Sequence, residues 1–188
     1  MNALLFTLAG FAVGDGRPLE AGASAVDITP KVFPVNMPGG FNENLAEKAH
    51  DPLHARAVVL GDGKLTIAFV LVDNLGLARE VCDEAKLLAS RKLDILPEHI
   101  LISATHTHSA PTANAREGRP GEVAHRKQVI DGIVEAIVKA AEARIPAAIG
   151  AASHPLPGEV YNRRWFLKPG KMPPNPFGGI DLVKMNPN

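Results

Sequence analysis

Residues 66–108 read TIAFVLVDNLGLAREVCDEAKLLASRKLDILPEHILISATHTH, and this stretch decides the fold class. It begins with an apolar run at residues 67–72, continues with a helical pattern over residues 79–93, and ends with a second short apolar run at residues 99–103. A strand, a helix and a strand at this spacing predict a right-handed crossover between two parallel strands. Because the first run is almost continuously apolar, it is typical of a strand that is buried on both faces.

The flanking segments extend this unit on both sides. Residues 56–60 form another β-rich run, and the Asp62-Gly63 pair that follows is suited to positive φ, so a hairpin with residues 66–72 is predicted. On the other side, apolar residues recur at helical spacing over residues 122–144, and residues 147–153 read as a further strand. The predicted class is α/β, with a mixed sheet, a βαβ crossover and helices packed on the sheet.

The composition is that of a soluble globular protein. Of the 188 residues, 46% are hydrophobic and 21% are charged, and 20 Lys and Arg balance 20 Asp and Glu. A chain of this length makes one domain or one lobe of a larger domain. Since neither charge accumulates, the sequence has no electrostatic footprint for nucleic acid or an anionic membrane. Cys82 is the only cysteine, which excludes an intrachain disulfide and a cysteine-based zinc site.

We expect a leader over residues 1–23, followed by a folded portion over residues 24–188. Residues 3–13 are apolar and have the length of a signal-peptide core, too short to cross a bilayer, and no basic residues precede them. Ala21-Gly22-Ala23 offers a candidate cleavage site. We therefore interpret the leader as an incomplete secretion signal, which predicts a secreted or periplasmic protein. An ordinary hydrophobic first segment is the alternative.

The polar end of the strand at residues 99–103 carries the strongest candidate site. His106 and His108 are separated by one residue, and in extended backbone their side chains project to the same face. In open α/β sheets ligands bind beyond the carboxyl ends of strands, and neutral imidazole is a good zinc ligand. A catalytic zinc needs three protein ligands, so two histidines do not complete a site. The alternative is a strand end whose histidines are merely exposed.

Weaker candidates lie near this strand or in loops. Asp73 follows the strand at residues 67–72, where it could accept a hydrogen bond from a ligand histidine or be an ordinary turn residue. Gly39-Gly40 marks a turn that allows close backbone approach to a ligand. Asn162-Arg163-Arg164 could hold a carbonyl or carboxylate, since arginine offers a rigid donor fork, or form a solvated basic turn. Weaker ligand candidates are His50, Asp51 and His54, and residues expected at the surface or as caps are His99, His125 and His154.

Several catalytic signatures are absent from the sequence. It holds no Gly-x-Ser-x-Gly, no glycine-rich phosphate loop, no His-Glu-x-x-His helix and no dinucleotide-binding fingerprint. A serine hydrolase, a nucleotide-dependent enzyme and a zincin are therefore disfavoured.

A series of motifs occurs in the order typical of one enzyme family. The motifs are Ala25-Val26-Asp27-Ile28-Thr29-Pro30, Gly39-Gly40-Phe41, residues 51–60 (DPLHARAVVL), residues 69–73 (FVLVD) and residues 103–111 (SATHTHSAP). With them the chain resembles the N-terminal part of the neutral/alkaline, non-lysosomal ceramidases over residues 22–165. The block Thr105-His106-Thr107-His108-Ser109 is the most specific piece of the resemblance.

The resemblance implies a zinc-dependent amidase that cleaves the N-acyl bond of ceramide, a hydrolase of sphingolipid metabolism. It implies that His106 binds zinc, and that His108 lies beside the substrate and stabilises the oxyanion. Arg163 would contact the polar end of the substrate, and the backbone of Gly39 and Gly40 would line its pocket. The implied partner is a lipid amide or a small-molecule amide, met at a membrane surface if it is a lipid, with neither nucleic acid nor an obligate protein partner.

Two features depart from the family pattern. Residues 109–113 read Ser-Ala-Pro-Thr-Ala where the family usually has Ser-Gly-Pro-Gly-Gly, which changes the loop beside the metal. The family's second zinc histidine and its Glu and Tyr ligands fall beyond residue 188, so we expect a truncated catalytic domain, an incomplete lobe that is inactive alone. A non-catalytic secreted domain of the same fold and a different metal-dependent hydrolase that uses His-x-His are the alternatives.

Overall fold

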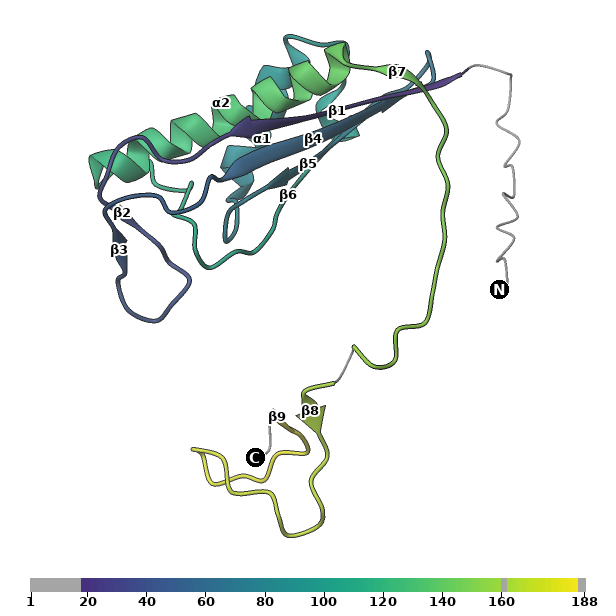
Figure 1. The fold of residues 1–188 in the computed structure, drawn as a ribbon. Helices are drawn as coiled ribbons and strands as arrows, with labels where there is room; N and C mark the ends of the chain where they lie inside the picture. The colour runs from purple at the N-terminus through teal and green to yellow at the C-terminus, as the bar shows by residue number, and fades with distance from the viewer. Residues whose placement is uncertain (1–17, 160–161, 186–188) are drawn as a thin grey trace, which may run out of the picture. The chain divides into compact units, whose positions relative to one another are not determined.

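A computed structural model of the chain describes residues 18–159 and 162–185. The chain divides into two units, residues 1–149 and 150–188, and each is described by itself. The first unit is built on a five-stranded sheet with the strand order β6-β5-β4-β1-β7 (Figure 1). The elements are β1 (Leu19–Asp27), β2 (Val35–Asn36), β3 (Leu45–Ala46), β4 (His54–Gly61), β5 (Thr66–Val72), α1 (Arg79–Ser90), the 3-10 helix η2 (Pro97–His99), β6 (Ile100–Ala104), α2 (Pro120–Glu142), β7 (Ile145–Ala147), β8 (Arg164–Trp165) and β9 (Lys184–Met185).

The crossover predicted within residues 66–108 is confirmed. β4 and β5 form an antiparallel hairpin, α1 follows, and β6 pairs parallel to β5. In the hairpin turn Gly63 has a positive φ of 81°, whereas Asp62 does not. The Asp62 carboxylate instead accepts hydrogen bonds from the backbone amides of Lys64 and Leu65. The class is therefore α/β with a mixed sheet, as predicted.

Several element boundaries differ from the prediction by a few residues. α1 ends at Ser90 rather than at residue 93. α2 begins at Pro120 rather than at residue 122. Proline is tolerated in the first turn of a helix, because the N–H that it lacks would have no partner within the helix there. The strand predicted at residues 147–153 is wrong, since β7 ends at Ala147. Ala147 faces Leu19, the first residue of β1, and within the described residues the pairing ends there.

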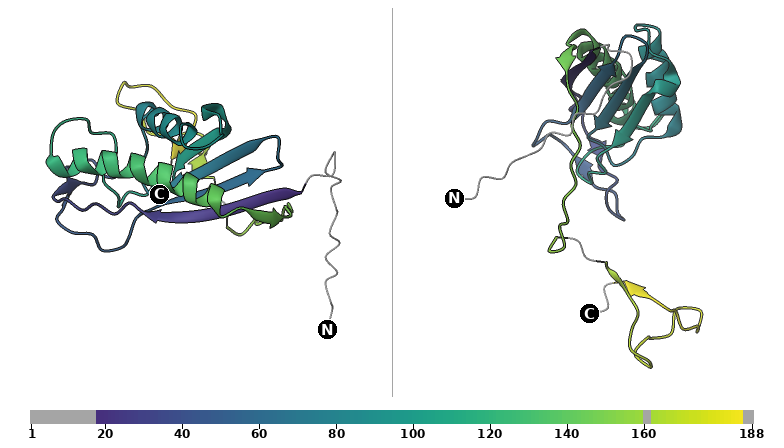
Figure 2. Two further views of the ribbon diagram at one scale, coloured as in Figure 1. Left: turned by 90° about the horizontal axis from the view of Figure 1, so that it is seen from above. Right: turned by 90° about the vertical axis from the view of Figure 1, so that its right-hand side faces the viewer.

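The core lies between the sheet and the two helices. α2 runs along β1 and β4 (Figure 2), and the strand side chains that face the helices are small, mostly Ala and Val. Two glycines allow this close packing, because a Cβ on Gly22 would overlap the Ala140 carbonyl oxygen and a Cβ on Gly132 would overlap the Ile28 side chain. Beside Gly132, Ile133 is fully buried. The helix therefore closes directly onto the sheet.

The opposite face of the sheet is open within the described residues. Phe69 and Leu71 of β5 are 44% and 42% exposed. The prediction that residues 67–72 are buried on both faces is therefore wrong, because the helices cover only one face. Val58 of β4 and Leu101 of β6 are exposed as well, so these apolar side chains form one surface across three strands.

The start of the sheet overlaps the predicted leader. β1 begins at Leu19, and Ala21-Gly22-Ala23, the candidate cleavage site, is paired with β4 in this strand. Residues 1–17, the apolar part of the predicted leader, lie outside the described residues. Leu19 is thus the start of the first strand that the structure describes.

The second unit contains the pair of antiparallel strands β8 and β9, and most of its described side chains are exposed. Its loops agree with the proline- and glycine-rich sequence of residues 151–188. In the described part of the chain, no helix is both long and apolar enough to span a membrane.

Candidate functional site

The chain leaves β5 and β6 at the same edge of the sheet, and the segments that follow lie against each other. We call residues 73–78 and 105–114 the paired loops. Hydrogen bonds join them along their length: Asn74 Nδ2 to the Pro111 oxygen at 2.9 Å, His106 Nδ1 to the Leu75 oxygen at 2.8 Å, and the Ala78 amide to Asn114 Oδ1 at 2.8 Å. The carboxyl edge of the sheet is therefore where the structure organises polar groups, as the sequence predicts.

His106 departs from regular backbone. β6 ends at Ala104, and His106 has φ 62°, in the left-handed region that residues other than glycine rarely adopt. The prediction that an extended strand presents His106 and His108 is therefore wrong. Their rings still converge, with centroids 5.2 Å apart in an edge-to-face arrangement. Backbone strain of this kind costs about 1–3 kcal/mol and concentrates at functional sites.

A backbone carbonyl orients the His106 ring. Its Nδ1 lies 2.8 Å from the Leu75 oxygen, and since a carbonyl can only accept, the bond requires the proton on Nδ1. In the neutral ring Nε2 then keeps its lone pair. Histidine ligands of metal ions commonly donate their second N–H to a carbonyl or carboxylate in this way. The arrangement leaves Nε2 free to bind a metal ion.

His108 packs against the backbone of Gly39. A Cβ on Gly39 would overlap the His108 Cβ and lie 2.5 Å from the His108 oxygen, so the approach requires glycine. A Cβ on Gly40 would have the Asn42 oxygen as its nearest neighbour, at 4.0 Å. The structure thus brings the Gly39 backbone against a histidine of the candidate site, which is a different contact from the predicted approach to a ligand. That both glycines line a substrate pocket stays a prediction.

Asp73 belongs to a small polar cluster at the end of β5. Its Oδ2 accepts hydrogen bonds from the His54 amide at 2.9 Å and from Arg56 Nη1 at 2.8 Å. His54 Nδ1 lies 3.3 Å from Arg56 Nη2. The Nδ1 partner of His106 is Leu75, so Asp73 is not the acceptor that orients this histidine.

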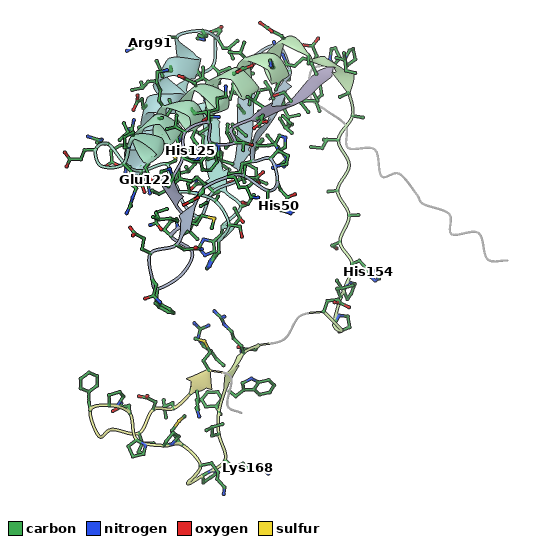
Figure 3. The ribbon with its side chains drawn as sticks, turned by 60° about the vertical axis from the view of Figure 1, so that its left-hand side comes forward. His50, Arg91, Glu122, His125, His154 and Lys168 are labelled. Carbon is green, nitrogen blue, oxygen red and sulfur yellow. The ribbon has the colours of Figure 1, made fainter. Side chains whose placement is uncertain are left out.

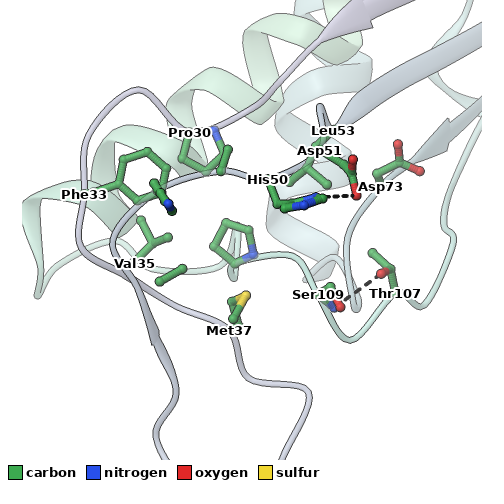
Figure 4. Close-up of a pocket in the computed structure, with 14 residues that line it drawn as sticks. Pro30, Phe33, Val35, Met37, His50, Asp51, Leu53, Asp73, Thr107 and Ser109 are labelled. Atoms are coloured by element: carbon green, nitrogen blue, oxygen red, sulfur yellow. Dashed lines mark hydrogen bonds and ion pairs between the residues drawn. The ribbon is translucent and has the colours of Figure 1, made fainter.

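An apolar cavity of about 490 Å³ opens beside the paired loops (Figure 4). The lining residues from 30–37 are apolar, whereas those from 46–53 include Lys48, His50 and Asp51. The paired loops add Asp73, Thr107 and Ser109. Thr107 and Ser109 alternate with the two histidines, so one loop serves both features. No pattern in the sequence predicts this cavity, because its wall comes from loops that meet only in the folded chain. The lining residues are Pro30, Phe33, Val35, Met37, Ala46, Lys48, Ala49, His50, Asp51, Leu53, Asp73, Thr107, Ser109 and Pro111.

His125 of α2 is buried, which overturns the expectation of a surface or capping residue. It is 1% exposed, and neither ring nitrogen has a hydrogen-bond partner in the described part of the chain. Figure 3 labels His125 among the side chains of the first unit. Burial disfavours the cation and lowers the pKa of His125 to about 4, so the ring is neutral at physiological pH. His99 is half-buried in η2, and His154 is exposed.

Arg163 lies in the second unit beside β8, and its side chain is exposed. Asn162 Oδ1 accepts a hydrogen bond from the Arg164 amide at 2.9 Å, which closes a turn around Arg163. This geometry is that of a solvated basic turn. The contact of Arg163 with a substrate stays a prediction.

The described residues do not assemble a complete metal site. Within residues 18–159 and 162–185, no three His, Cys, Asp or Glu side chains gather closely enough to hold a metal ion. His106 is thus one oriented candidate ligand without two protein partners among the residues described. Three protein ligands are the usual number for a catalytic zinc.

Comparisons with known proteins place this geometry in a wider context. The sequence pattern of a family described as neutral/alkaline non-lysosomal ceramidase, N-terminal, matches residues 19–166. The neutral ceramidase from Pseudomonas aeruginosa has a similar fold, with 21% sequence identity and a TM-score of 0.59 over 70% of this chain and 23% of that chain. A ceramidase complexed with C2 has 20% identity and a TM-score of 0.56 over 69% of this chain and 22% of that chain.

The chain therefore spans less than a quarter of the length of these solved structures. A search of curated proteins finds no match. At this level of identity the structural likeness establishes the fold, and the family match over most of the chain establishes descent.

Proposed function

The chain belongs to the neutral/alkaline non-lysosomal ceramidase family, and from this premise we propose that it supplies part of a zinc-dependent site that hydrolyses the amide bond of an N-acyl lipid such as ceramide. The similar solved structures are more than four times as long as the stretch they share with it. We therefore propose that the remaining zinc ligands belong to a longer protein of which this chain is the N-terminal portion.

The observation that carries the proposal is the state of His106. Its strained backbone, with φ 62°, and its Nδ1 bond to the Leu75 oxygen together fix one neutral tautomer and one ring direction. This is the donor chemistry that a zinc-binding histidine needs, so the residue fits the group that the family implies. When bound, zinc supplies a Lewis acid that activates water for attack on a carbonyl. His106 would be one of its ligands.

His108 has a separate role in the proposed reaction. Its ring lies 5.2 Å from the His106 ring, measured between centroids, and Gly39 supports its backbone. A histidine N–H this close to the metal ligand would donate a hydrogen bond to the oxygen of the amide carbonyl as negative charge develops there. One such donor lowers the barrier by about 2.7–4 kcal/mol in a well-studied hydrolase.

The cavity supports a lipid amide as the substrate class. Its lining is mainly apolar, and Thr107 and Ser109 of the loop that carries both histidines belong to that lining. A hydrocarbon chain would bury apolar surface in it, at about 0.8 kcal/mol for each CH₂ group. Arg163 would contact the polar end of the substrate. A secreted or periplasmic location, with encounter at a membrane surface, belongs to the same proposal.

Zinc content and hydrolysis test this proposal together. The 188-residue chain is expected to bind zinc weakly, to lose it on dialysis, and to leave ceramide intact, because too few ligands are present. Metal content after dialysis, a competitive zinc titration and a ceramide hydrolysis assay measure these three properties. His106→Ala is expected to abolish the weak binding.

His154→Ala is the matched control, since His154 is exposed and lies in the second unit. It should leave the zinc titration unchanged. Stoichiometric zinc after dialysis, or ceramide hydrolysis by this chain alone, would contradict the proposal that ligands are missing. Equal zinc binding by the wild type and by His106→Ala would remove His106 from the site.

A further inference from the structure

Asn74 is the one fully buried amide side chain among the described residues, and it belongs to the first of the paired loops. Its Nδ2 donates to the Pro111 oxygen at 2.9 Å, three residues after His108. Its Oδ1 accepts from the Gly76 amide at 3.3 Å. A buried amide is expensive unless its hydrogen bonds are made, so both bonds hold the side chain in place.

The bond to Gly76 controls the backbone at Leu75. A side-chain oxygen that accepts from the amide two residues on closes an Asx turn, and Leu75 is the residue between them. The Leu75 oxygen is the acceptor for His106 Nδ1, at 2.8 Å. The Gly76 N–H and the Leu75 carbonyl belong to the same peptide group, so the turn that Asn74 closes and the bond to His106 use the two sides of one peptide.

The bond to Pro111 controls the other side of the histidines. Thr105 is tied to β5 through its amide, which donates to the Val72 oxygen at 2.9 Å. Pro111 is tied to Asn74. The segment between them carries both histidines, so it is anchored at one end on the last residue of β5 and at the other on the loop that follows β5. An anchored segment of this length can keep the strained backbone of His106, which a free loop would relax.

We propose that Asn74 is a positioning residue for His106: it presents the Leu75 carbonyl to Nδ1 and anchors the chain after His108, so that Nε2 is held as the free nitrogen. The inference rests on the proposed function only in the role of this nitrogen, which is to bind zinc. The positioning itself is a property of the metal-free chain, and it is tested without metal.

Nitrogen-15 NMR of the histidine rings measures the tautomer directly. At a pH of about 8.5 an ordinary imidazole is neutral, and wild-type His106 is expected to show a protonated Nδ1 and an unprotonated Nε2. Asn74→Ala removes both bonds and is expected to give a mixture of the two tautomers. Asn74→Ser keeps an oxygen for the Gly76 amide but loses the bond to Pro111, so an intermediate result is expected even if the alanine variant does not fold.

Asn114→Ala is the matched control. It removes another hydrogen bond between the same two loops, the one that the Asn114 side chain accepts from the Ala78 backbone amide. It should leave the His106 signals unchanged, and circular dichroism should show a native fold in every variant that is compared. An unchanged His106 tautomer in the folded Asn74 variants, or an equal change in Asn114→Ala, overturns the proposal.

A second measurement separates this inference from the proposed function. In the competitive zinc titration, Asn74→Ala and Asn74→Ser are expected to bind about 10-fold to 100-fold more weakly than the wild type, the usual effect of losing a group that orients a ligand. If the wild type binds no zinc but its His106 tautomer depends on Asn74, the proposed function fails and the positioning stands. If zinc binds and the His106 tautomer is unchanged in the Asn74 variants, only the positioning role of Asn74 fails.

Discussion

Two regions of the first unit are built in opposite ways. One is the core between the sheet and α2, and the other is the paired loops at the edge of the same sheet. The core is filled by small apolar side chains and buried Ile and Val, with glycines where the backbones approach most closely. The paired loops are joined by polar bonds and contain a strained histidine. Stability therefore resides in the covered face of the sheet and the candidate chemistry at its edge, so changes in one region should largely spare the other.

The largest effect is expected from emptying the core. Ile133 is fully buried in α2, and Ile133→Ala leaves a cavity that should lower the free energy of unfolding by roughly 4 kcal/mol. Denaturant unfolding measures the loss. Val123→Ala, on the same helix at a position that is 36% exposed, should cost less than about 1 kcal/mol. Similar losses for the two variants would show that α2 is not packed as described.

Acid should lower the free energy of unfolding through His125, by slightly less than Ile133→Ala lowers it. The pKa of His125 is about 4 in the folded chain and near 6.5 when unfolded, so between these values the unfolded state binds the extra proton. Stability contributed by this residue is therefore intact above pH 6.5 and falls as the pH drops to 4, by about 3 kcal/mol in all.

Comparison with His125→Leu isolates this effect, because leucine is apolar and does not titrate. The difference in unfolding free energy between the two proteins, measured at several pH values, should grow as the pH falls from 6.5 to 4. Parallel pH curves would mean that His125 becomes protonated without cost, and that its burial is not maintained in solution.

The smallest change in stability is expected at the edge, from Gly39→Ala. The new methyl group would displace the His108 backbone, and because the loop can move away, the cost should be about 1 kcal/mol. The NMR signals of the His108 ring should nevertheless shift strongly. Gly40→Ala, where a methyl group has room, should change neither stability nor these signals. Equal effects of the two substitutions would refute the contact between Gly39 and His108.

Local patterns predicted the scaffold well. The apolar runs and helical spacing of residues 66–144 identify β5, α1, β6 and α2, because the period of each pattern is set by the backbone geometry of its own element. The faces of the sheet were less predictable. Residues 67–72 are apolar on both sides, yet Phe69 and Leu71 are exposed here, since the sequence of a strand does not say which layers lie over it.

By itself the sequence determined the α/β class, the place of the candidate site after β6, the two histidines and, through its ordered motifs, the family. Only the tertiary structure decided the left-handed backbone of His106, its Leu75 acceptor, the burial of His125 and the hydrogen bond by which Asn74 joins the two loops. The physical reason is distance along the chain. Helical and strand periods are local, whereas the bond from His106 to Leu75 joins residues 31 positions apart, and the bond from Asn74 to Pro111 joins residues 37 positions apart.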